Sequence, residues 1–337
     1  MRVGLVSFAH VHAASYATLL SRTPDVELLA ADPGHTTRPP SESGGRPLAA
    51  ELGVAYVDSY DDLYAWRPDA VVICSENVDH RNDVVRAAAA RVHVLCEKPL
   101  ATTSVDAAAM TAACEQAGVF LMVAHPVRFA PAFAALRAGV AAGDLGAVRA
   151  VSGTNNGQVP TARAWFTDPA RSGGGAVTDH VVHLADLLDA LLDGQRVTSV
   201  YAVANRVLQP DRDLETAALV SLTYANGVTA VIDCSWSRPA HYPTWGGLTL
   251  NLVTDAGLVD LDPFGQRVDG YSESTRGPLW LGYGTDLDQL LLTAFLDSVR
   301  TGVPPQPDGH VGYRTVRTVE AAYESLRLGQ PVDLTWD

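Results

Sequence analysis

Short apolar runs alternate with helix-like segments in the first part of the chain. Buried strands are predicted at residues 3–8, 26–31, 54–57, 70–74, 92–96 and 119–124. Helical patterns lie between them, at residues 12–21, from Ser59, at 79–90 and after a cap at Thr103 or Ser104. Residues 33–47 are rich in Pro, Gly, Ser and Thr and are expected to form a loop. Continuously apolar strands that alternate with helices predict an α/β domain with a doubly wound parallel sheet.

After about residue 150 the pattern changes to a series of strands. They are expected at residues 148–154, 197–208, 217–224, 228–235, 248–254 and 257–261. Asn226-Gly227 lies between two of them and predicts a tight hairpin turn. Helices are expected at residues 177–193, 285–301 and 310–328. This pattern predicts an α+β domain with a large, open, mostly antiparallel sheet.

The length of the chain also favours two domains, because 337 residues exceed the usual size of one core. The predicted division is a doubly wound domain at residues 1–124 and an α+β domain at residues 125–337. The closing helix at 310–328 can pack back on the first domain.

Composition excludes several classes of protein. No stretch of about 18 apolar residues predicts a membrane span. The N-terminus lacks a secretory h-region, which predicts a cytoplasmic location. A net charge of −14 argues against nucleic acid as a partner. The cysteines stand far apart in the sequence, so neither a disulfide framework nor a structural metal site is expected: Cys74, Cys96, Cys114 and Cys234.

Two segments carry residues suited to acid–base chemistry. Lys98 follows an apolar strand, in Glu97-Lys98-Pro99, and Asp179 and His183 follow a triple glycine at 173–175. Four-residue spacing puts Asp179 and His183 on one face of a helix. Lys, Asp and His are the groups that move a proton off an alcohol while a cofactor takes the hydride. The alternatives are a surface lysine and a buried core histidine.

The turn after the first strand is the expected site for a dinucleotide pyrophosphate. Its residues are Ser7, Phe8, Ala9, His10 and Val11, and Ser7, Ala9 and His12 replace the glycines of GxGxxG. Asp32 ends the second strand, where a carboxylate binds the adenosine ribose and repels a 2′-phosphate, so NAD is favoured over NADP. Asp32 can instead be a turn residue, and Arg38 or Arg46 can accommodate NADP.

Several segments in order along the chain resemble the Gfo/Idh/MocA oxidoreductase family, the group of glucose-fructose oxidoreductase and inositol dehydrogenase. The most specific motif, Leu95 through Ala101, is intact, whereas Glu76 replaces a usual proline and Val181 a usual glycine. The other matching segments are 74–80, 128–131, 143–146, Trp165, 173–183 with Asp186, 321–325 and 329–332.

The resemblance implies a Rossmann cofactor domain and a domain for substrate binding and oligomerisation. It implies that Lys98 binds the substrate hydroxyl beside the nicotinamide, that His183 takes the alcohol proton and that Asp179 orients the substrate or the lysine, without a metal. A cis Lys98–Pro99 bond is expected. His180 is interpreted as structural, with a substrate contact left open. Further cofactor residues are Ser75, Glu76, Asn77, His80 and Glu97, and further substrate residues are His125, Arg128, Asn156 and Trp165. Arg128 can instead form a structural salt bridge, and Trp165 can be a core residue.

The leading interpretation is an NAD(P)-dependent oxidoreductase that transfers a hydride between nicotinamide and a secondary hydroxyl or ketone of a sugar, inositol or related polyol. One alternative is NAD-assisted oxidation and elimination on a glycoside. Another is a non-catalytic NAD(P)-sensing regulator. A homodimer or homotetramer is expected through the open face of the second sheet, where Leu219 and Val231 lie and where Trp236 would be buried.

Overall fold

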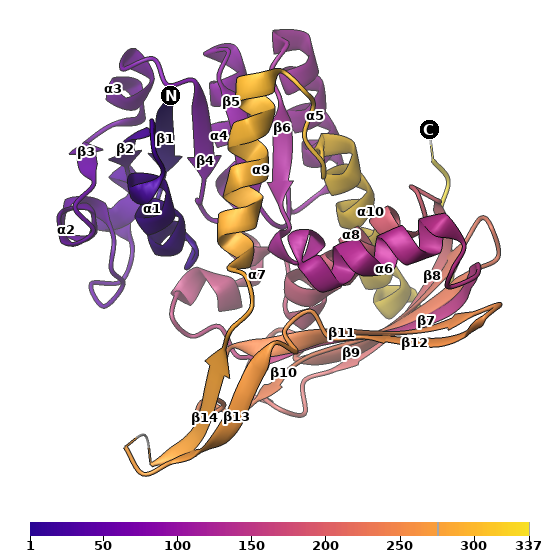
Figure 1. The fold of residues 1–337 in the computed structure, drawn as a ribbon. Helices are drawn as coiled ribbons and strands as arrows, with labels where there is room; N and C mark the ends of the chain where they lie inside the picture. The colour runs from indigo at the N-terminus through magenta and orange to yellow at the C-terminus, as the bar shows by residue number, and fades with distance from the viewer. Residues whose placement is uncertain (275, 337) are drawn as a thin grey trace. The chain divides into compact units, whose positions relative to one another are not determined.

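The computed structural model describes residues 1–274 and 276–336 (Figure 1). These residues form two compact units, each assembled from separate stretches of the chain. The first unit comprises Met1–His125, Thr161–Gly173 and Asp288–Val316. The second comprises Pro126–Pro160, Gly174–Leu287 and the chain from Arg317 onward. Two segments that follow the expected domain boundary at residue 124, Thr161–Gly173 and Asp288–Val316, therefore group with the first unit. The second of these segments includes the beginning of the closing helix.

The first unit contains a six-stranded sheet in the order β3-β2-β1-β4-β5-β6, and all its neighbouring strands are parallel. Every residue of β4 and of β6 is buried, as expected for a sheet covered on both faces. This confirms the predicted doubly wound arrangement. The strands are β1 (Arg2–Val6), β2 (Glu27–Ala31), β3 (Ala55–Val57), β4 (Ala70–Ile73), β5 (His93–Glu97) and β6 (Leu121–Ala124).

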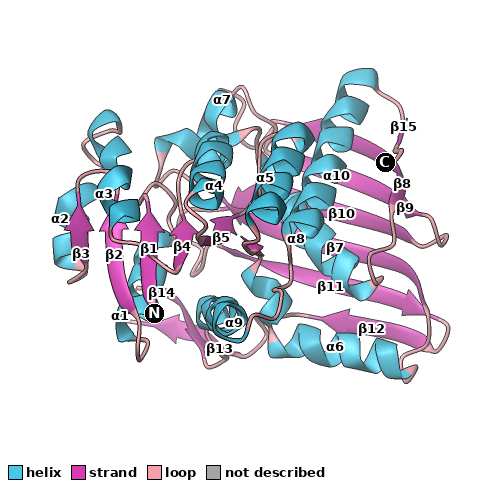
Figure 2. Cartoon of the chain, turned by 90° about the horizontal axis from the view of Figure 1, so that it is seen from above, coloured by secondary structure: helices cyan, strands magenta, loops and turns pink. Residues whose placement is uncertain are grey.

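Helices cover both faces of this sheet. In Figures 1 and 2, α1 and α9 lie on one face and α4 and α5 on the other. Ser59 and Thr103 cap α3 and α5, because their side chains accept hydrogen bonds from the backbone N–H of Asp62 and Asp106. The helices are α1 (Ala13–Arg22), α2 (Gly45–Glu51), α3 (Tyr60–Ala65), α4 (His80–Ala89), α5 (Ser104–Ala117), α7 (Pro169–Ser172) and α9 (Leu287–Thr301).

The expected loop at residues 33–47 is in part helical. A 3₁₀ turn runs from Pro33 to Thr37, and α2 begins at Gly45. Pro47 suggests a loop from sequence, but it lies in the first turn of α2, where its missing N–H costs no helical hydrogen bond. The prediction was wrong at this point because the position of the proline within the turn cannot be read from composition.

The second unit contains a seven-stranded sheet in the order β12-β11-β7-β10-β9-β8-β15. Neighbouring strands are antiparallel except for β7 and β10, which are parallel. The turn at Asn226-Gly227 joins β9 to β10, and Gly227 has a φ of 84°, so the hairpin prediction is confirmed. The strands are β7 (Val148–Gln158), β8 (Val197–Asn205), β9 (Ala217–Tyr224), β10 (Thr229–Arg238), β11 (Gly246–Thr254), β12 (Gly257–Leu261) and β15 (Val332–Asp333).

The helices of the second unit lie on one face of its sheet (Figure 1). They are α6 (Pro131–Ala142), α8 (Ala176–Leu191) and the later half of α10 (Gly309–Leu328). Burial alternates along β9 and β10, so their opposite face carries exposed Leu219 and Val231. Trp236 is 2% exposed and lies in the core, so the expectation that an oligomer buries it was wrong.

Three elements of this unit were not predicted. Helix α6 starts at Pro131, and β13 (Arg267–Ser272) pairs with β14 (Gly277–Gly282) in a separate two-stranded sheet. This hairpin mixes aromatic, glycine and charged residues, so it lacks the alternating pattern that marks a half-buried strand.

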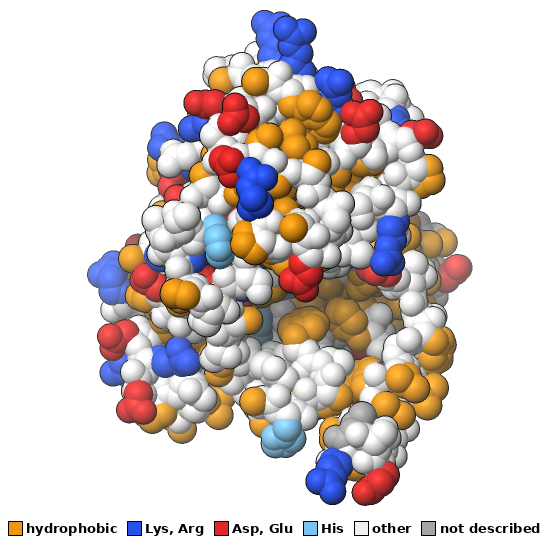
Figure 3. Space-filling view, turned by 90° about the vertical axis from the view of Figure 1, so that its left-hand side faces the viewer, with side chains coloured by type: hydrophobic (Ala, Val, Ile, Leu, Met, Phe, Trp, Pro, Cys, Tyr) orange, Lys and Arg blue, Asp and Glu red, His pale blue; other side chains and the backbone are white. Residues whose placement is uncertain are grey.

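Charge and hydropathy can be examined on the visible surface and on the helices. On the face shown in Figure 3, acidic and basic side chains are interspersed rather than gathered into a basic stripe. Among the described helices none has the length and hydropathy of a membrane span. The cytoplasmic location stays a prediction.

Candidate active-site residues in the two units

The loop after β1 forms a tight turn without glycine. Ser7 has a φ of 71°, in the left-handed region that usually favours glycine. Its hydroxyl donates to Oδ1 of Asp32, at 2.9 Å, and accepts from the backbone N–H of Ala9, at 3.1 Å. Phe8 and Ala9 are buried, Val11 is exposed, and α1 begins directly afterwards. The chain therefore retains the turn and the helix N-terminus that a pyrophosphate requires.

Asp32 is buried and bonded to the loop that follows it. Its Oδ2 accepts from the guanidinium of Arg38 and from the backbone N–H of Gly45, the latter at 2.8 Å. Arg38 is therefore neutralised by Asp32, whereas Arg46 pairs with Asp58 at 2.7 Å on the surface. A buried carboxylate, paired with Arg38, thus stands at the end of β2, where the sequence places the ribose.

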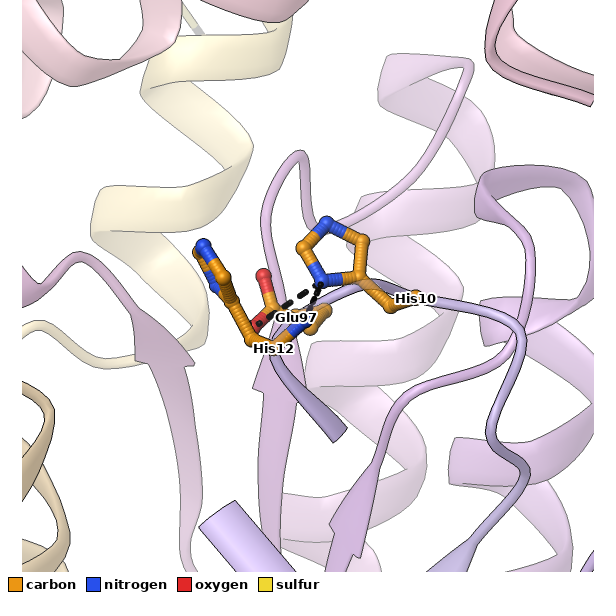
Figure 4. A group of neighbouring side chains, drawn as sticks. All are labelled: His10, His12 and Glu97. Atoms are coloured by element: carbon orange, nitrogen blue, oxygen red, sulfur yellow. Dashed lines mark hydrogen bonds and ion pairs between the residues drawn. The ribbon is translucent and has the colours of Figure 1, made fainter. Parts of the chain in front are cut away.

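Two histidines of the first loop surround Glu97, at the end of β5 (Figure 4). His12 Nδ1 lies 2.9 Å and His10 Nδ1 lies 3.6 Å from Oε1 of Glu97. His12 thus occupies the position of the third glycine of GxGxxG, and its side chain hydrogen-bonds to Glu97, the first residue of the Glu-Lys-Pro motif.

The surroundings shift the pKa values of the two imidazoles in opposite directions. Burial lowers the pKa of His10, and its Nδ1 accepts from the backbone N–H of His12 at 3.2 Å, as in a neutral ring protonated at Nε2. Burial alone would lower the pKa of His12 as well, but the attraction of Glu97 outweighs it and raises that pKa. One side-chain atom each of His10, His12 and Glu97 lies within 4.8 Å of the other two, which is close enough to hold a metal ion. Because His10 Nδ1 is already hydrogen-bonded, we assign the group to hydrogen bonding.

Lys98 is 6% exposed and follows Glu97 directly. It is the single lysine among the 24 Lys and Arg residues of the chain. Its backbone N–H donates to Oε2 of Glu97, at 3.1 Å, and the Lys98–Pro99 bond is cis, as predicted. His80 joins this turn to the loop after β4, because its ring nitrogens face the carbonyl oxygens of Pro99, at 2.9 Å, and of Ser75, at 3.3 Å.

The segment 161–173 packs on these loops of the first unit. Arg163 and Trp165 donate to the carbonyl oxygen of Ala9, each at 3.1 Å. Arg171 pairs with Glu76, and Ser172 accepts at its carbonyl from the side chain of Asn77, at 2.8 Å. Trp165 is 2% exposed, which agrees with the alternative of a packing role. The cofactor roles predicted for Ser75, Glu76, Asn77 and His80 stay predictions.

Helix α8 carries the predicted Asp179 and His183. All its other residues, from Ala176 to Leu191, are buried, whereas these two are partly exposed. The helical periodicity thus puts both side chains on the one accessible stripe, as the four-residue spacing predicted.

Asp179 is held by two neighbours that the sequence did not connect with it. Trp236 Nε1 donates to Oδ2 of Asp179, at 3.1 Å. His180 Nε2 lies 3.2 Å from the same oxygen, and His180 Nδ1 lies 2.8 Å from the carbonyl oxygen of Asn155. Trp236 lies on β10 of the sheet beneath the helix, so long-range pairing was needed to find its contact, whereas His180 is the next residue of α8 itself.

The other predicted substrate residues are less accessible. Arg128 forms a buried ion pair with Asp186, at 2.6 Å, which agrees with the structural alternative. His125 is buried, and Asn156 accepts from the hydroxyl of Ser235 at 2.9 Å. Their substrate contacts stay predictions.

The N-terminus of α8 is fixed by Glu215, which the sequence did not single out. Its Oε1 accepts from the backbone N–H groups of Gly175, at 3.0 Å, and Val177, at 2.9 Å, and from the hydroxyl of Tyr323, at 2.8 Å. A carboxylate at a helix N-terminus is favourable because it meets free N–H groups and the positive end of the helix dipole.

An aromatic cavity of about 210 Å³ lies in the second unit. Its walls include Trp245, Phe264 and Trp280, and the Trp245 ring lies 6.3 Å from the ring of His180. The cavity thus begins close to the contacts of Asp179.

Two family descriptions match most of the chain. Residues 3–125 match the oxidoreductase family with an NAD-binding Rossmann fold, and residues 133–259 match the GFO/IDH/MocA C-terminal domain. The chain belongs to the Gfo/Idh/MocA oxidoreductase family. It is therefore an oxidoreductase with an NAD-binding domain, which confirms the resemblance found in the sequence.

Similar proteins agree with this membership. The D-apiose dehydrogenase of Paraburkholderia graminis is 32% identical over 83% of this chain and 76% of its own. The NADP⁺-dependent D-xylose 1-dehydrogenase 2 of Haloferax volcanii is 33% identical over 87% of this chain and 89% of its own. GenD2 of gentamicin A biosynthesis, solved in complex with NAD, has a TM-score of 0.88 at 25% identity, covering 100% of this chain and 97% of its own.

Proposed function

We propose that this protein is an NAD(P)-dependent dehydrogenase acting on a secondary hydroxyl of a sugar, inositol or related polyol. The observation that carries the proposal is the accessible stripe of α8, where Asp179 and His183 alone are partly exposed on an otherwise buried helix. Partly exposed acid–base groups on a rigid, buried element suit catalysis, because the fold holds them in place.

Lys98 supplies a second argument. Arginine serves at every other long basic position of the chain, so the retention of one lysine, nearly buried at a strand end, indicates a need for an ammonium group. An ammonium is a compact donor that can also release a proton, whereas a guanidinium cannot. Lys98 would hold the substrate hydroxyl, His183 would take its proton and Asp179 would orient it. The bound dinucleotide supplies the hydride acceptor.

The residues of the first unit suit NAD. The turn at Ser7 leads directly into the N-terminus of α1, and Asp32 puts a carboxylate at the end of β2. Arg38, the basic residue nearest to Asp32, is already bonded to it. This arrangement favours NAD over NADP.

The substrate class rests on the relatives and on the aromatic cavity. Both curated relatives described above are named for sugars. Trp245 and Phe264 line a cavity in the second unit, and aromatic walls with a few polar groups are common in ligand sites.

We also propose that the protein assembles as a homo-oligomer through the sheet face opposite α8. Leu219 is 48% and Val231 is 41% exposed on that face, and adjoining strands add Val203 and Val253. Exposed apolar side chains on a sheet face that no helix covers are typical of an association surface.

A substrate screen tests the proposed activity. The protein is mixed with NAD⁺ or NADP⁺ and with sugars, sugar acids and inositols, and NAD(P)H is followed by absorbance. We expect reduction of NAD⁺ with at least one polyol, together with loss of that signal in Lys98→Ala. Absence of turnover across the panel by a protein that binds NAD⁺ in calorimetry would contradict the proposal.

A further inference from the structure

The aromatic cavity of the second unit is formed by the turn before β11 and by the segment of the β13–β14 hairpin. Trp245 comes from the turn, Phe264 precedes β13 and Trp280 lies on β14. The rings of Trp245 and Phe264 stand nearly perpendicular, at 84°, with their centroids 6.1 Å apart. Aromatic surfaces in different planes therefore border the cavity.

Contacts within the protein hold these walls in place. The guanidinium carbon of Arg267 lies 4.2 Å from the centre of the Trp280 ring, and Asp262 fixes Arg267 at 2.9 Å. The carbonyl oxygen of Trp245 accepts from the backbone N–H of Gln158, on β7, at 2.6 Å. Walls that are already ordered lower the entropic cost of binding a ligand.

The lining offers amide and hydroxyl groups but no charge. Among the described residues that line the cavity, none is charged. Gln266 and Thr285 are exposed lining residues, and their side-chain amide and hydroxyl have no hydrogen-bond partner within the described part of the chain. A Cβ at Gly284 would lie 2.8 Å from Oε1 of Gln266, so this glycine leaves room for the amide at the wall.

This lining selects the chemistry of a ligand. A charged ligand would find no opposite charge on the walls, and a purely apolar one would cover Gln266 and Thr285 without giving them partners, which is costly. A neutral ring with hydroxyl groups meets both conditions, because its C–H face packs on aromatic rings and its hydroxyls pair with the amide and the threonine. The volume of about 210 Å³ is smaller than the roughly 300–1,000 Å³ of sites for drug-sized ligands, so one ring fits.

The cavity adjoins the accessible stripe of α8 without including it. The Trp245 ring lies 6.3 Å from the ring of His180, the neighbour of Asp179. Asp179 and His183 are not among the residues that line the cavity. A ring seated in the cavity therefore does not touch the acid–base pair, and a reacting hydroxyl beside that pair must belong to another part of the same molecule.

We propose that the cavity binds a second, non-reacting neutral sugar ring, so that the substrate is a glycoside of at least two rings. Trp245 and Trp280 pack on this ring, and Gln266 and Thr285 bond to its hydroxyls, while the reacting ring lies along the accessible stripe of α8. The identity of the substrate rests on the proposed function, whereas the binding of a neutral sugar in the cavity does not.

Fluorine magnetic resonance tests the cavity without turnover. The protein is labelled with 5-fluorotryptophan, and the signals of Trp245 and Trp280 are assigned by their loss in Trp245→Phe and Trp280→Phe. Cellobiose, maltose and lactose are titrated, with glucuronate as a charged ring. We expect saturable shifts of both signals with at least one disaccharide, about tenfold weaker binding in Gln266→Leu, and a glucuronate affinity lower by about tenfold or more.

No shift of either signal with any disaccharide would overturn the proposal. A glucuronate affinity equal to that of the neutral sugars would overturn the ligand class.

Paired substrates test the second ring. Each monosaccharide is assayed beside disaccharides that contain it, and kcat/KM should be higher by about tenfold or more for a glycoside, because a remote ring adds binding energy. Gln266→Leu should lower this glycoside-to-monosaccharide ratio by about tenfold. Tyr271→Ser, on the same hairpin but outside the lining of the cavity, should leave the ratio unchanged.

A higher kcat/KM for a monosaccharide than for every glycoside, or a ratio that Gln266→Leu leaves unchanged, would overturn the role of the second ring. If Gln266→Leu fails to fold, as circular dichroism would show, Thr285→Val takes its place with the same expected direction. Failure of every sugar and glycoside to react would count against the proposed function, and the fluorine titration would still decide whether the cavity binds a neutral sugar.

Discussion

Glu215 accepts a hydrogen bond from the backbone N–H of Val177, 2.9 Å away, in the first turn of the helix that carries Asp179 and His183. The same oxygen also accepts from Gly175 and from Tyr323. We predict that Glu215→Ala lowers the free energy of unfolding by about 2 kcal/mol, because it leaves helix N–H groups without their acceptor. Urea denaturation measures the change.

Tyr323→Phe is the matched control for this prediction. It removes a hydroxyl that donates to Glu215 and also contacts Gly175 and Thr178, but it leaves the carboxylate and its two backbone contacts in place, so the loss should be smaller, about 1 kcal/mol. A greater loss in Tyr323→Phe than in Glu215→Ala would contradict the assignment of the carboxylate as the cap of α8.

The sequence predicted what depends on local pattern. The continuous apolar strands, the helix start at Ser59, a cap at Thr103 or Ser104, the turn at Asn226-Gly227 and the shared face of Asp179 and His183 all follow from patterns along the chain. The contacts that orient these groups come from distant segments. Trp236, for example, reaches Asp179 only because β10 pairs with β7 beneath α8, and no periodicity encodes that register.

The first loop shows the same limit. Its departure from GxGxxG is visible in the sequence, but the consequence is not. The structure shows that Ser7 adopts the left-handed turn by bonding to Asp32 and that His12 bonds to Glu97, each across strands. Pro47 misled the prediction in the opposite direction, because a helical first turn tolerates proline.

The contacts of Asp32 lead to a prediction about the choice between NAD and NADP. Asp32→Ser removes the negative charge and releases Arg38, so we expect the preference for NAD over NADP, measured as a ratio of Kd values, to fall by about tenfold. The double variant Asp32→Ser/Arg38→Ala should lose most of the gained NADP affinity. Tighter NADP than NAD binding by the unaltered protein would contradict the role of Asp32.

Burial of Asp83 leads to a prediction about how the stability of the fold depends on pH. Burial of this side chain in α4 raises its pKa from 3.8 to about 6. A folded-state pKa above the unfolded value adds stability that is present at low pH and is lost as pH rises through about 6. Asp83→Asn should therefore be more stable than wild type at about pH 8, by roughly 3 kcal/mol, and differ little at about pH 4.

Thermal unfolding at both pH values tests this prediction. The exposed Asp144→Asn serves as the control, because it changes the same net charge without a buried carboxylate. An equal effect of the two substitutions at both pH values would show that net charge, rather than burial of Asp83, governs the response.

The open face of the second sheet leads to a prediction about the oligomeric state. We expect light scattering of the wild-type protein to give a multiple of the 35.7 kDa chain mass. Leu219→Glu/Val231→Lys should shift the mass toward the monomer, because charges on an apolar contact are costly to bury. The exposed hairpin residue Tyr271→Ser serves as the control and should leave the mass unchanged. A monomeric wild-type protein at micromolar concentration would exclude the proposed interface.

The central claim is that Lys98 and His183 act on the substrate hydroxyl, and the turnover number of their variants tests it most directly. With the polyol found in the screen, we expect Lys98→Ala and His183→Ala each to lower kcat by about a hundredfold or more, with unchanged circular dichroism. Lys98→Arg should be nearly as slow, because a guanidinium keeps the charge but cannot replace the ammonium. A kcat near that of wild type in Lys98→Ala would contradict the account.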